Sequence, residues 1–309
     1  MPASPLVASP PVSTRARMVA LAVLVTVLWS SSWILIRTGL DDAELPPLTF
    51  AGLRYGLAAV ALTAWLTARR PRPGLPLLTQ RHVGSWHRNR VRTVPWGRIV
   101  VLGVVQFAVT QGAQFVAIDH QPAATTSLLL ATTPLVVALT SGVIGERPTV
   151  IHLLAGVAIG VGAAVYFSGE LGWTAIGLTA ALVGLGGNAA AVLLGRATMR
   201  AAHVDATELT RTTMAIGAAT LLVTGVALDG WPSVTLTGAA IVVWLAIVNT
   251  AAAFTWWNVC LRHLPAAEVA AINSTMVIQI PLLAWIFLDE PLGWAEDAGL
   301  AVVAAGVVL

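Results

Sequence analysis

Charged residues are scarce in this chain, and lysine is absent. Only 10% of the 309 residues are charged and 57% are hydrophobic, whereas an average soluble domain has about 25% charged and roughly 45 to 50% apolar residues. All 17 basic residues are arginines. This composition excludes an ordinary soluble domain and indicates an integral membrane protein.

Cysteine is rare in this chain, and the common catalytic motifs are absent. Cys260 is the only cysteine, which excludes an intrachain disulfide and a CxxC or CxxH metal site. The chain has no HExxH, GxSxG or P-loop motif and no paired carboxylates within an apolar run. We therefore expect no catalytic residue, no metal, no cofactor and no ATP drive. A membrane enzyme or a non-transporting sensor stays an alternative, but the appended domain or clustered site that it requires is not visible.

Long apolar runs are what the chain has in abundance. A bilayer core of about 30 Å takes about 20 helical residues to cross. The alternation typical of a membrane β-barrel is absent. Ten runs of suitable length lie near residues 18–38, 47–67, 97–117, 123–144, 149–168, 172–194, 208–228, 238–259, 266–288 and 293–309. The sequence therefore predicts an all-α integral membrane protein with ten transmembrane helices.

The arginines predict how the chain is oriented. With a cytoplasmic N-terminus, 15 of the 17 arginines lie on the inner side, Arg37 lies outside and Arg54 lies within a span, as the positive-inside rule requires. Residues 1–17 read as a disordered cytoplasmic tail. The stretch 69–98 has eight arginines and reads as an inner loop that anchors the topology, or that contacts anionic lipid headgroups. Nothing beyond charge supports nucleic-acid binding.

One hydrophobic unit occurs twice in the chain. Residues 119–124 read Asp-His-Gln-Pro-Ala-Ala, and residues 262–267 read Arg-His-Leu-Pro-Ala-Ala, 143 positions later. Each copy leads to a glutamate near a proline, Glu146 or Glu290. The residue before the shared histidine changes sign, which predicts that the copies start on opposite sides of the membrane. Such an inverted repeat, here 18–168 followed by 172–309, is typical of transporters.

The residues around this repeat resemble a known family. They are Leu28 to Trp33 with Arg37, Arg54 with Tyr55, Pro122 to Ala124, Pro134, Gly145 to Pro148, Pro265 to Ala267, Pro281 and Leu288 to Pro291. In their order and spacing they are similar to the drug/metabolite transporter superfamily, in its EamA-like branch. The resemblance implies two five-helix halves around a central cavity and alternating access. It also implies export of small metabolites, with amino acids or their derivatives favoured. Separately, we expect a location in the bacterial inner membrane and a monomer.

Polar side chains deep in the apolar runs are the candidates for substrate contact, because such groups are costly in hydrocarbon unless they face a wet interior or a partner. Arg54 lies seven residues into its run, about 10 Å deep at about 1.5 Å per residue. It could bind a substrate carboxylate or phosphate, or pair with Glu44, Asp41 or carbonyls. Arg211 has an obvious partner in Glu208. Shifting Gln106 by 143 residues places it on Asn249, so both halves have an amide at the same depth.

The complete set of predicted substrate contacts is Trp29, Ser32, Arg54, Gln106, Gln111, Gln114, Asn188, Asn249, Asn273 and Gln279. For Trp29 a cavity wall and a packed core are both open. For each amide, hydrogen bonding between helices is an equally good explanation. Together, however, these residues indicate a wet interior.

Two prolines are candidates for gating. Pro134 and Pro281 each remove a helical hydrogen bond, which frees the carbonyls of Leu130 and Val277. Kinked helices with free carbonyls can line a site and act as gates, although a static kink is the alternative.

Proton-coupled efflux of cationic drugs is the second transport hypothesis. In the small multidrug resistance relatives that activity depends on a glutamate in the first helix, and residues 18–38 contain no acid. Glu268 could titrate instead. Transport of small metabolites therefore remains the favoured prediction.

Overall fold

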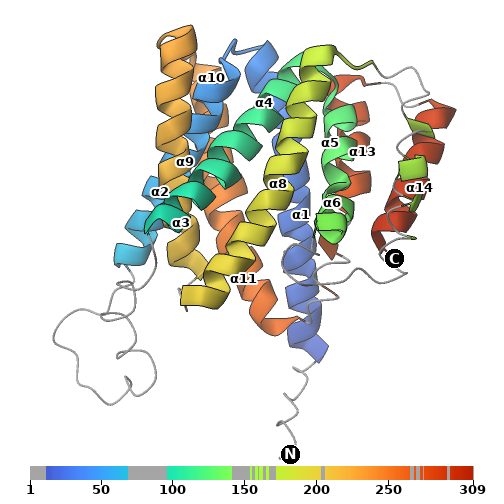
Figure 1. The fold of residues 1–309 in the computed structure, drawn as a ribbon, viewed down its shortest axis with the longest axis horizontal. Helices are drawn as coiled ribbons and strands as arrows, with labels where there is room; N and C mark the ends of the chain where they lie inside the picture. The colour runs from blue at the N-terminus through green and yellow to red at the C-terminus, as the bar shows by residue number, and fades with distance from the viewer. Residues whose placement is uncertain are drawn as a thin grey trace, which may run out of the picture.

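The fold was analysed in a computed structural model. It describes residues 12–68, 96–140, 172–202, 206–264, 275–290 and 293–308, together with 154, 157–158, 160–162, 165–166, 268 and 272–273. The regular structure of these residues is helical (Figure 1).

Six helical segments are long and apolar enough to cross a membrane. They comprise α1 (Val12–Asp41), α2 (Pro47–Ala68), the run of α3 (Trp96–Gly103), η3 (Val104–Val109) and α4 (Thr110–His120), α8 (Ala175–Ala202), α9 (Ala206–Asp229), and the run of α10 (Leu236–Ala246), η5 (Ile247–Ala252) and α11 (Ala253–His263). Shorter apolar helices are α5 (Ala123–Ala131), α6 (Thr133–Thr140), α13 (Met276–Leu288) and α14 (Trp294–Val308). The protein is thus an all-helical membrane protein.

Where the structure describes them, the helices follow the predicted runs, with one difference at the N-terminal end. Because α1 begins at Val12, residues 12–17 are helical rather than part of a disordered tail. Most of the predicted run at 149–168 lies outside the described residues, as do the loop at 69–95, Glu146 and Pro265.

The repeat predicted at a spacing of 143 residues is matched by equivalent local features in the two halves. The π-helical segments η3 and η5 are 143 positions apart at both ends. His120 Nδ1 lies 3.0 Å from the carbonyl of Val116, and His263 Nδ1 lies 2.8 Å from that of Val259. Both helices thus end with the same local geometry.

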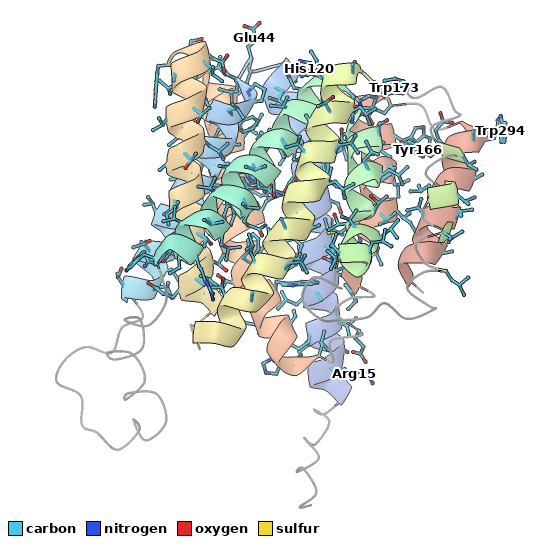
Figure 2. All side chains as sticks on the ribbon, in the orientation of Figure 1. Arg15, Glu44, His120, Tyr166, Trp173 and Trp294 are labelled. Carbon is cyan, nitrogen blue, oxygen red and sulfur yellow. The ribbon has the colours of Figure 1, made fainter. Side chains whose placement is uncertain are left out.

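The two ends of the helix bundle are named here by a residue at each. Glu44, His120 and Trp173 lie at the upper end, called the His120 end, and Arg15 lies at the lower, Arg15 end (Figure 2). The helix α4 finishes at the His120 end, whereas α11 finishes at the Arg15 end (Figure 1). The two equivalent helices therefore run in opposite directions.

Close approach of α9 to its neighbours holds the larger core together. A methyl group at Gly217 would lie 2.3 Å from Cβ of Phe107 in η3, and one at Gly52 would lie 2.7 Å from the side chain of Leu222. Small residues at such crossings let backbones pack directly, as is common in membrane helix pairs. This core includes Phe50, Phe107 and Phe115. It joins residues of α2, η3, α4 and α9 to residues of α1, α10 and η5.

Candidate functional site

Arg54 is buried in the middle of the bundle without a carboxylate beside it. Its side chain is 6% exposed. Nε donates to Thr250 Oγ1 (3.1 Å), Nη2 donates to Ser32 Oγ (3.4 Å), and the guanidinium carbon lies 5.1 Å from the centroid of the Tyr55 ring. Within the described residues, Arg54 makes no ion pair.

The carboxylates proposed from the sequence as partners of Arg54 lie elsewhere. Asp41 pairs with Arg37 at a distance of 2.6 Å, and Glu44 is exposed at the His120 end (Figure 2). A buried charge is costly unless it is paired and hydrogen-bonded. Among the described residues, the charge of Arg54 is therefore met by hydroxyl groups and the Tyr55 ring rather than by a carboxylate.

Asn249 lies next to Arg54 through a shared hydroxyl. Its Nδ2 donates to the Leu28 carbonyl (2.5 Å), Ser31 Oγ (3.1 Å) and Ser32 Oγ (3.0 Å). Ser32 Oγ thus accepts from both Asn249 and Arg54, and it donates to the Leu28 carbonyl at 3.2 Å. The other amide atom, Asn249 Oδ1, is buried and has no hydrogen-bond partner in the described part of the chain.

The π-helical segment η5 explains why two polar residues in succession both reach this centre. Thr250 Oγ1 donates to the Leu245 carbonyl, five residues back, at 2.8 Å. A π turn inserts one extra residue into a helix and is common at functional sites. Asn249 and Thr250 are consequently both buried and contact Ser32 and Arg54, respectively.

Further polar and aromatic contacts surround this centre. Tyr55 Oη donates to Gln111 Oε1 (2.5 Å). Closer along α1 to the Arg15 end, Gln279 Oε1 accepts from Ser30 (2.9 Å) and Gln279 Nε2 donates to Thr26 (3.2 Å). The Trp29 ring packs against aromatic rings of α11, with its centroid 5.3 Å from that of Phe254 and 5.0 Å from that of Trp257.

The structure therefore brings together six of the ten predicted contacts along α1. Ser32, Arg54 and Asn249 form the centre, here called the Arg54 cluster together with Ser31 and Thr250. Gln111 joins it through Tyr55, and Trp29 lies on the same helix as Ser32. Gln279 contacts the next turn of α1, at Thr26 and Ser30.

Four predicted contacts lie apart from the cluster. Asn188 donates to Thr133 Oγ1 (3.1 Å) and so joins α8 to α6. Asn273 is exposed, Gln106 is half-buried and Gln114 is buried. Among the described residues the side chains of these three glutamine and asparagine residues make no hydrogen bond. Gln106 does occupy the position equivalent to Asn249, in η3, but without the serines that Asn249 contacts.

Pro134 lies at a helix interruption as expected, whereas Pro281 does not. The chain breaks between α5 and α6 at Thr132, just before Pro134, and α13 begins after Thr275. The two threonines are 143 residues apart, and each hydroxyl donates to the carbonyl three residues earlier. Pro281 lies inside the continuous helix α13. The Leu130 carbonyl, expected to be free because of Pro134, accepts from Thr133 Oγ1 at 2.6 Å.

Tyr55 and Thr250 are contacts that the sequence analysis did not select. Each directly follows a selected residue, Arg54 or Asn249, and a helix normally turns consecutive side chains about 100° apart. The π turn at η5 could not be foreseen from composition. The hydroxyl of Tyr55 could have been noticed as one of only two tyrosines in the chain.

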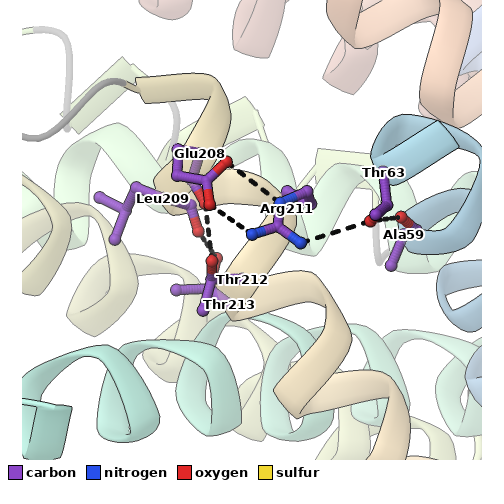
Figure 3. Close-up of polar contacts among 7 residues, drawn as sticks. All are labelled: Ala59, Thr63, Glu208, Leu209, Arg211, Thr212 and Thr213. Carbon is purple, nitrogen blue, oxygen red and sulfur yellow. Dashed lines mark hydrogen bonds and ion pairs between the residues drawn. The ribbon is translucent and has the colours of Figure 1, made fainter. Parts of the chain in front are cut away.

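Arg211 has the structural role that its spacing predicted. It pairs with Glu208, its Nε donating to Glu208 Oε2 at 3.1 Å, and also reaches Thr63 Oγ1 at 3.4 Å (Figure 3). Its charge is thus compensated within α9, in contrast to that of Arg54. In the part of the chain that the structure describes, no group of His, Cys, Asp and Glu could hold a metal ion.

Comparison with known proteins identifies the family. The model of the EamA-like transporter family matches residues 16–168 and again 175–309. A search of curated proteins found no match. Among solved structures, one described only as "Crystal structure of protein" has a TM-score of 0.62 at 19% identity, covering 94% of this chain and 97% of that one; this likeness concerns the fold. The two matched units together span nearly all of the sequence, and the chain therefore belongs to the EamA-like transporter family, whose members are membrane transporters and not enzymes.

Proposed function

We propose that this protein is a secondary active transporter that exports small metabolites bearing a carboxylate, with amino acids or their derivatives as the favoured substrates. The Arg54 cluster is the proposed binding site. The two family units act as an inverted repeat, and alternating access exposes the cluster first to one side of the membrane and then to the other.

The observation that carries this proposal is the uncompensated charge of Arg54. The guanidinium has five N–H donors, and the fork suits the two oxygens of a carboxylate. Nε and Nη2 are engaged by Thr250 and Ser32, and Nη1 has no hydrogen bond to the described protein. An arriving carboxylate supplies the missing negative charge and an acceptor for Nη1.

Asn249 favours an amino acid over a simple carboxylic acid. Its buried Oδ1 is an acceptor without a partner, and an ammonium group is a donor without acceptors. Asn249 and Arg54 both donate to Ser32 Oγ. The acceptor Oδ1 of Asn249 and the positive charge of Arg54 are therefore close enough to bind the ammonium and the carboxylate of one zwitterion. The aromatic contacts of Trp29 with Phe254 and Trp257 lie on the adjoining turn of α1.

The arginine distribution and the family support the proposed orientation and cellular setting. The arginine distribution favours an N-terminus in the cytoplasm, which assigns the Arg15 end to the inside and the His120 end to the outside. We propose a monomer in the bacterial inner membrane. The alternative of multidrug efflux loses support because Glu268, its candidate proton carrier, pairs with Arg15.

Flux through the purified protein in liposomes tests this function. Vesicles are loaded with labelled amino acids, the matching decarboxylated amines, sugars or nucleosides. We expect saturable flux for at least one compound with a carboxylate, and none for its matched amine. Absence of flux across the whole panel contradicts the proposal.

Arg211 provides the matched control for Arg54 in the same assay. Arg54→Gln removes the proposed ligand, and loss of a charge-assisted hydrogen bond of about 1.5 to 3 kcal/mol lowers the rate at limiting substrate by about 10-fold or more. Arg211→Gln removes an arginine that Glu208 already neutralises, and it is expected to retain flux. Equal losses in both variants would contradict a ligand role for Arg54.

A further inference from the structure

The helix α5 begins without any cap of its own. Its N-cap residue is Pro122, which makes no side-chain cap, and it is followed by Ala123 and Ala124. The first N–H groups of a helix have no partner within the helix. Both alanines are 0% exposed, so their N–H groups need a partner from elsewhere in the protein.

Glu290 supplies that partner from the other family unit. One carboxylate oxygen, Oε1, accepts the N–H of Ala123 at 2.8 Å, and Oε2 accepts the N–H of Ala124 at 3.0 Å. The residues are 167 and 166 positions apart in the chain. A negative charge at this place also interacts favourably with the dipole of α5. The cap thus joins the two repeats directly.

The end of α13 directs the carboxylate of Glu290 toward α5. Asp289 follows the last helical residue in the left-handed conformation, with φ 52° and ψ 27°. The N–H of Glu290 then returns to the carbonyl of Ala284 at 3.4 Å. The N–H of Asp289 returns to the same carbonyl, and the left-handed residue reverses the chain at the helix end. It places Glu290 beside α5, which packs against α13 (Figure 1).

The positively charged Arg37 binds the end of α4, just before the turn whose other end Glu290 caps. Its Nη1 donates to the carbonyls of Ile118 (2.5 Å) and Asp119 (3.2 Å) in the last turn of α4. A cation is favourable at a helix C-terminus. The turn between α4 and α5 is therefore held by Arg37 from α1 and by Glu290 from the second repeat.

A polar cavity gives water access to these contacts. It has a volume of about 340 Å³ and is lined by Arg37, Asp41, Asp119, His120, Gln121, Pro122, Leu288 and Glu290. Burial raises the pKa of the Glu290 carboxyl, although the two backbone N–H groups oppose this change. Removing the ionised carboxylate from water thus costs free energy, and water entering the cavity would reduce that cost.

We propose that Glu290 is a latch between the two repeats: its carboxylate keeps the His120 end closed while it caps α5, and it leaves Ala123 and Ala124 when that end opens. This inference rests on the alternating access proposed above. It assigns to Glu290 a positioning role at the outer end, remote from the Arg54 cluster.

Thiol labelling of α5 tests the latch without any substrate. In a Cys260→Ala background, Ser127→Cys places a reporter in α5, one turn beyond the cap, where Ser127 is 6% exposed. Labelling with a water-soluble maleimide is followed in purified protein in nanodiscs. Glu290→Ala leaves two buried N–H groups without an acceptor, and we expect labelling to become about 10-fold faster or more. Glu44→Ala, which removes an exposed carboxylate at the same end, is the matched control and is expected to change nothing.

Native Cys260 distinguishes an opened end from a loosened fold. It is 0% exposed and packs in α11 toward the Arg15 end, so its labelling in Glu290→Ala should stay as slow as in the wild type. An unchanged rate at Ser127→Cys would overturn the latch, and so would faster labelling at both positions. Since the assay uses no substrate, failure to find flux would reject the proposed substrate class without changing this result.

Discussion

At the scale of single residues, Arg54 and Arg211 differ in what surrounds their charge. Arg211 has Glu208 three positions earlier on the same helix, and this pairing follows from helical spacing alone. The depth of Arg54 was also predictable from its position in an apolar run. Its lack of a carboxylate partner was not, because that depends on residues such as Thr250, which lies 196 positions away.

Ser32 gives a residue-scale prediction, because it contacts both Arg54 and Asn249. Ser32→Asp would supply an internal carboxylate to Arg54 in place of the substrate. We expect the variant to fold with a thermal midpoint at least equal to that of the wild type. Its affinity for carboxylate ligands should fall by about 10-fold or more, consistent with the loss of a charged hydrogen bond.

The control for that measurement is Ser32→Ala, which removes the hydroxyl but leaves the charge of Arg54 uncompensated. It should retain most of the ligand affinity. Thermal-shift titration of both variants provides the comparison, since a ligand stabilises the folded state in proportion to its binding. Equal affinities in Ser32→Asp and the wild type would show that Arg54 does not receive the carboxylate.

At the scale of helices, the sequence located the transmembrane runs but not their internal irregularities. Pro134 follows the break at Thr132 as expected, but Pro281 lies inside α13, which begins after Thr275. In both places the threonine hydroxyl donates to a carbonyl of the preceding turn, which bends helices. The π turns at η3 and η5 escape prediction for a different reason: their segments are mostly apolar, so a shift of the helical register by one residue leaves no readable change in the polar pattern.

Helix packing gives a prediction at Gly217, where α9 contacts η3. An added methyl group would meet Phe107 Cβ at 2.3 Å and the Gly103 carbonyl at 2.6 Å. Gly217→Ala must therefore separate two helices, and overpacking of this kind costs about 1 to 3 kcal/mol. We expect a lower thermal midpoint for the purified variant.

Gly186 in α8 is the matched control, since a methyl group there has no atom of a neighbouring element within 4 Å. Gly186→Ala also improves helix propensity and should leave the midpoint unchanged or raise it. A similar decrease in both variants would show that the contact between α9 and η3 is not what limits stability.

At the scale of the whole molecule, the repeat was the most informative feature of the sequence. The spacing of 143 residues between the two Pro-Ala-Ala segments correctly identified Gln106 and Asn249 as equivalent positions of the two repeats, as the matching segments η3 and η5 show. It could not indicate that Asn249 rather than Gln106 is joined to Arg54, because this link requires Ser31 and Ser32 of α1 to lie against Asn249. Nor could it link Glu290 to Ala123, a contact between units that requires the packing of α13 on α5.

Calorimetric binding of an amino acid and its carboxamide tests the central claim most directly. The two ligands, chosen from the compounds that show flux, differ only in the charge of the group that Arg54 is proposed to bind. We predict that the wild type binds the acid about 10-fold or more tightly than the amide, and that Arg54→Gln removes this difference while its monodispersity stays unchanged. Undiminished preference for the acid in folded Arg54→Gln would contradict the account.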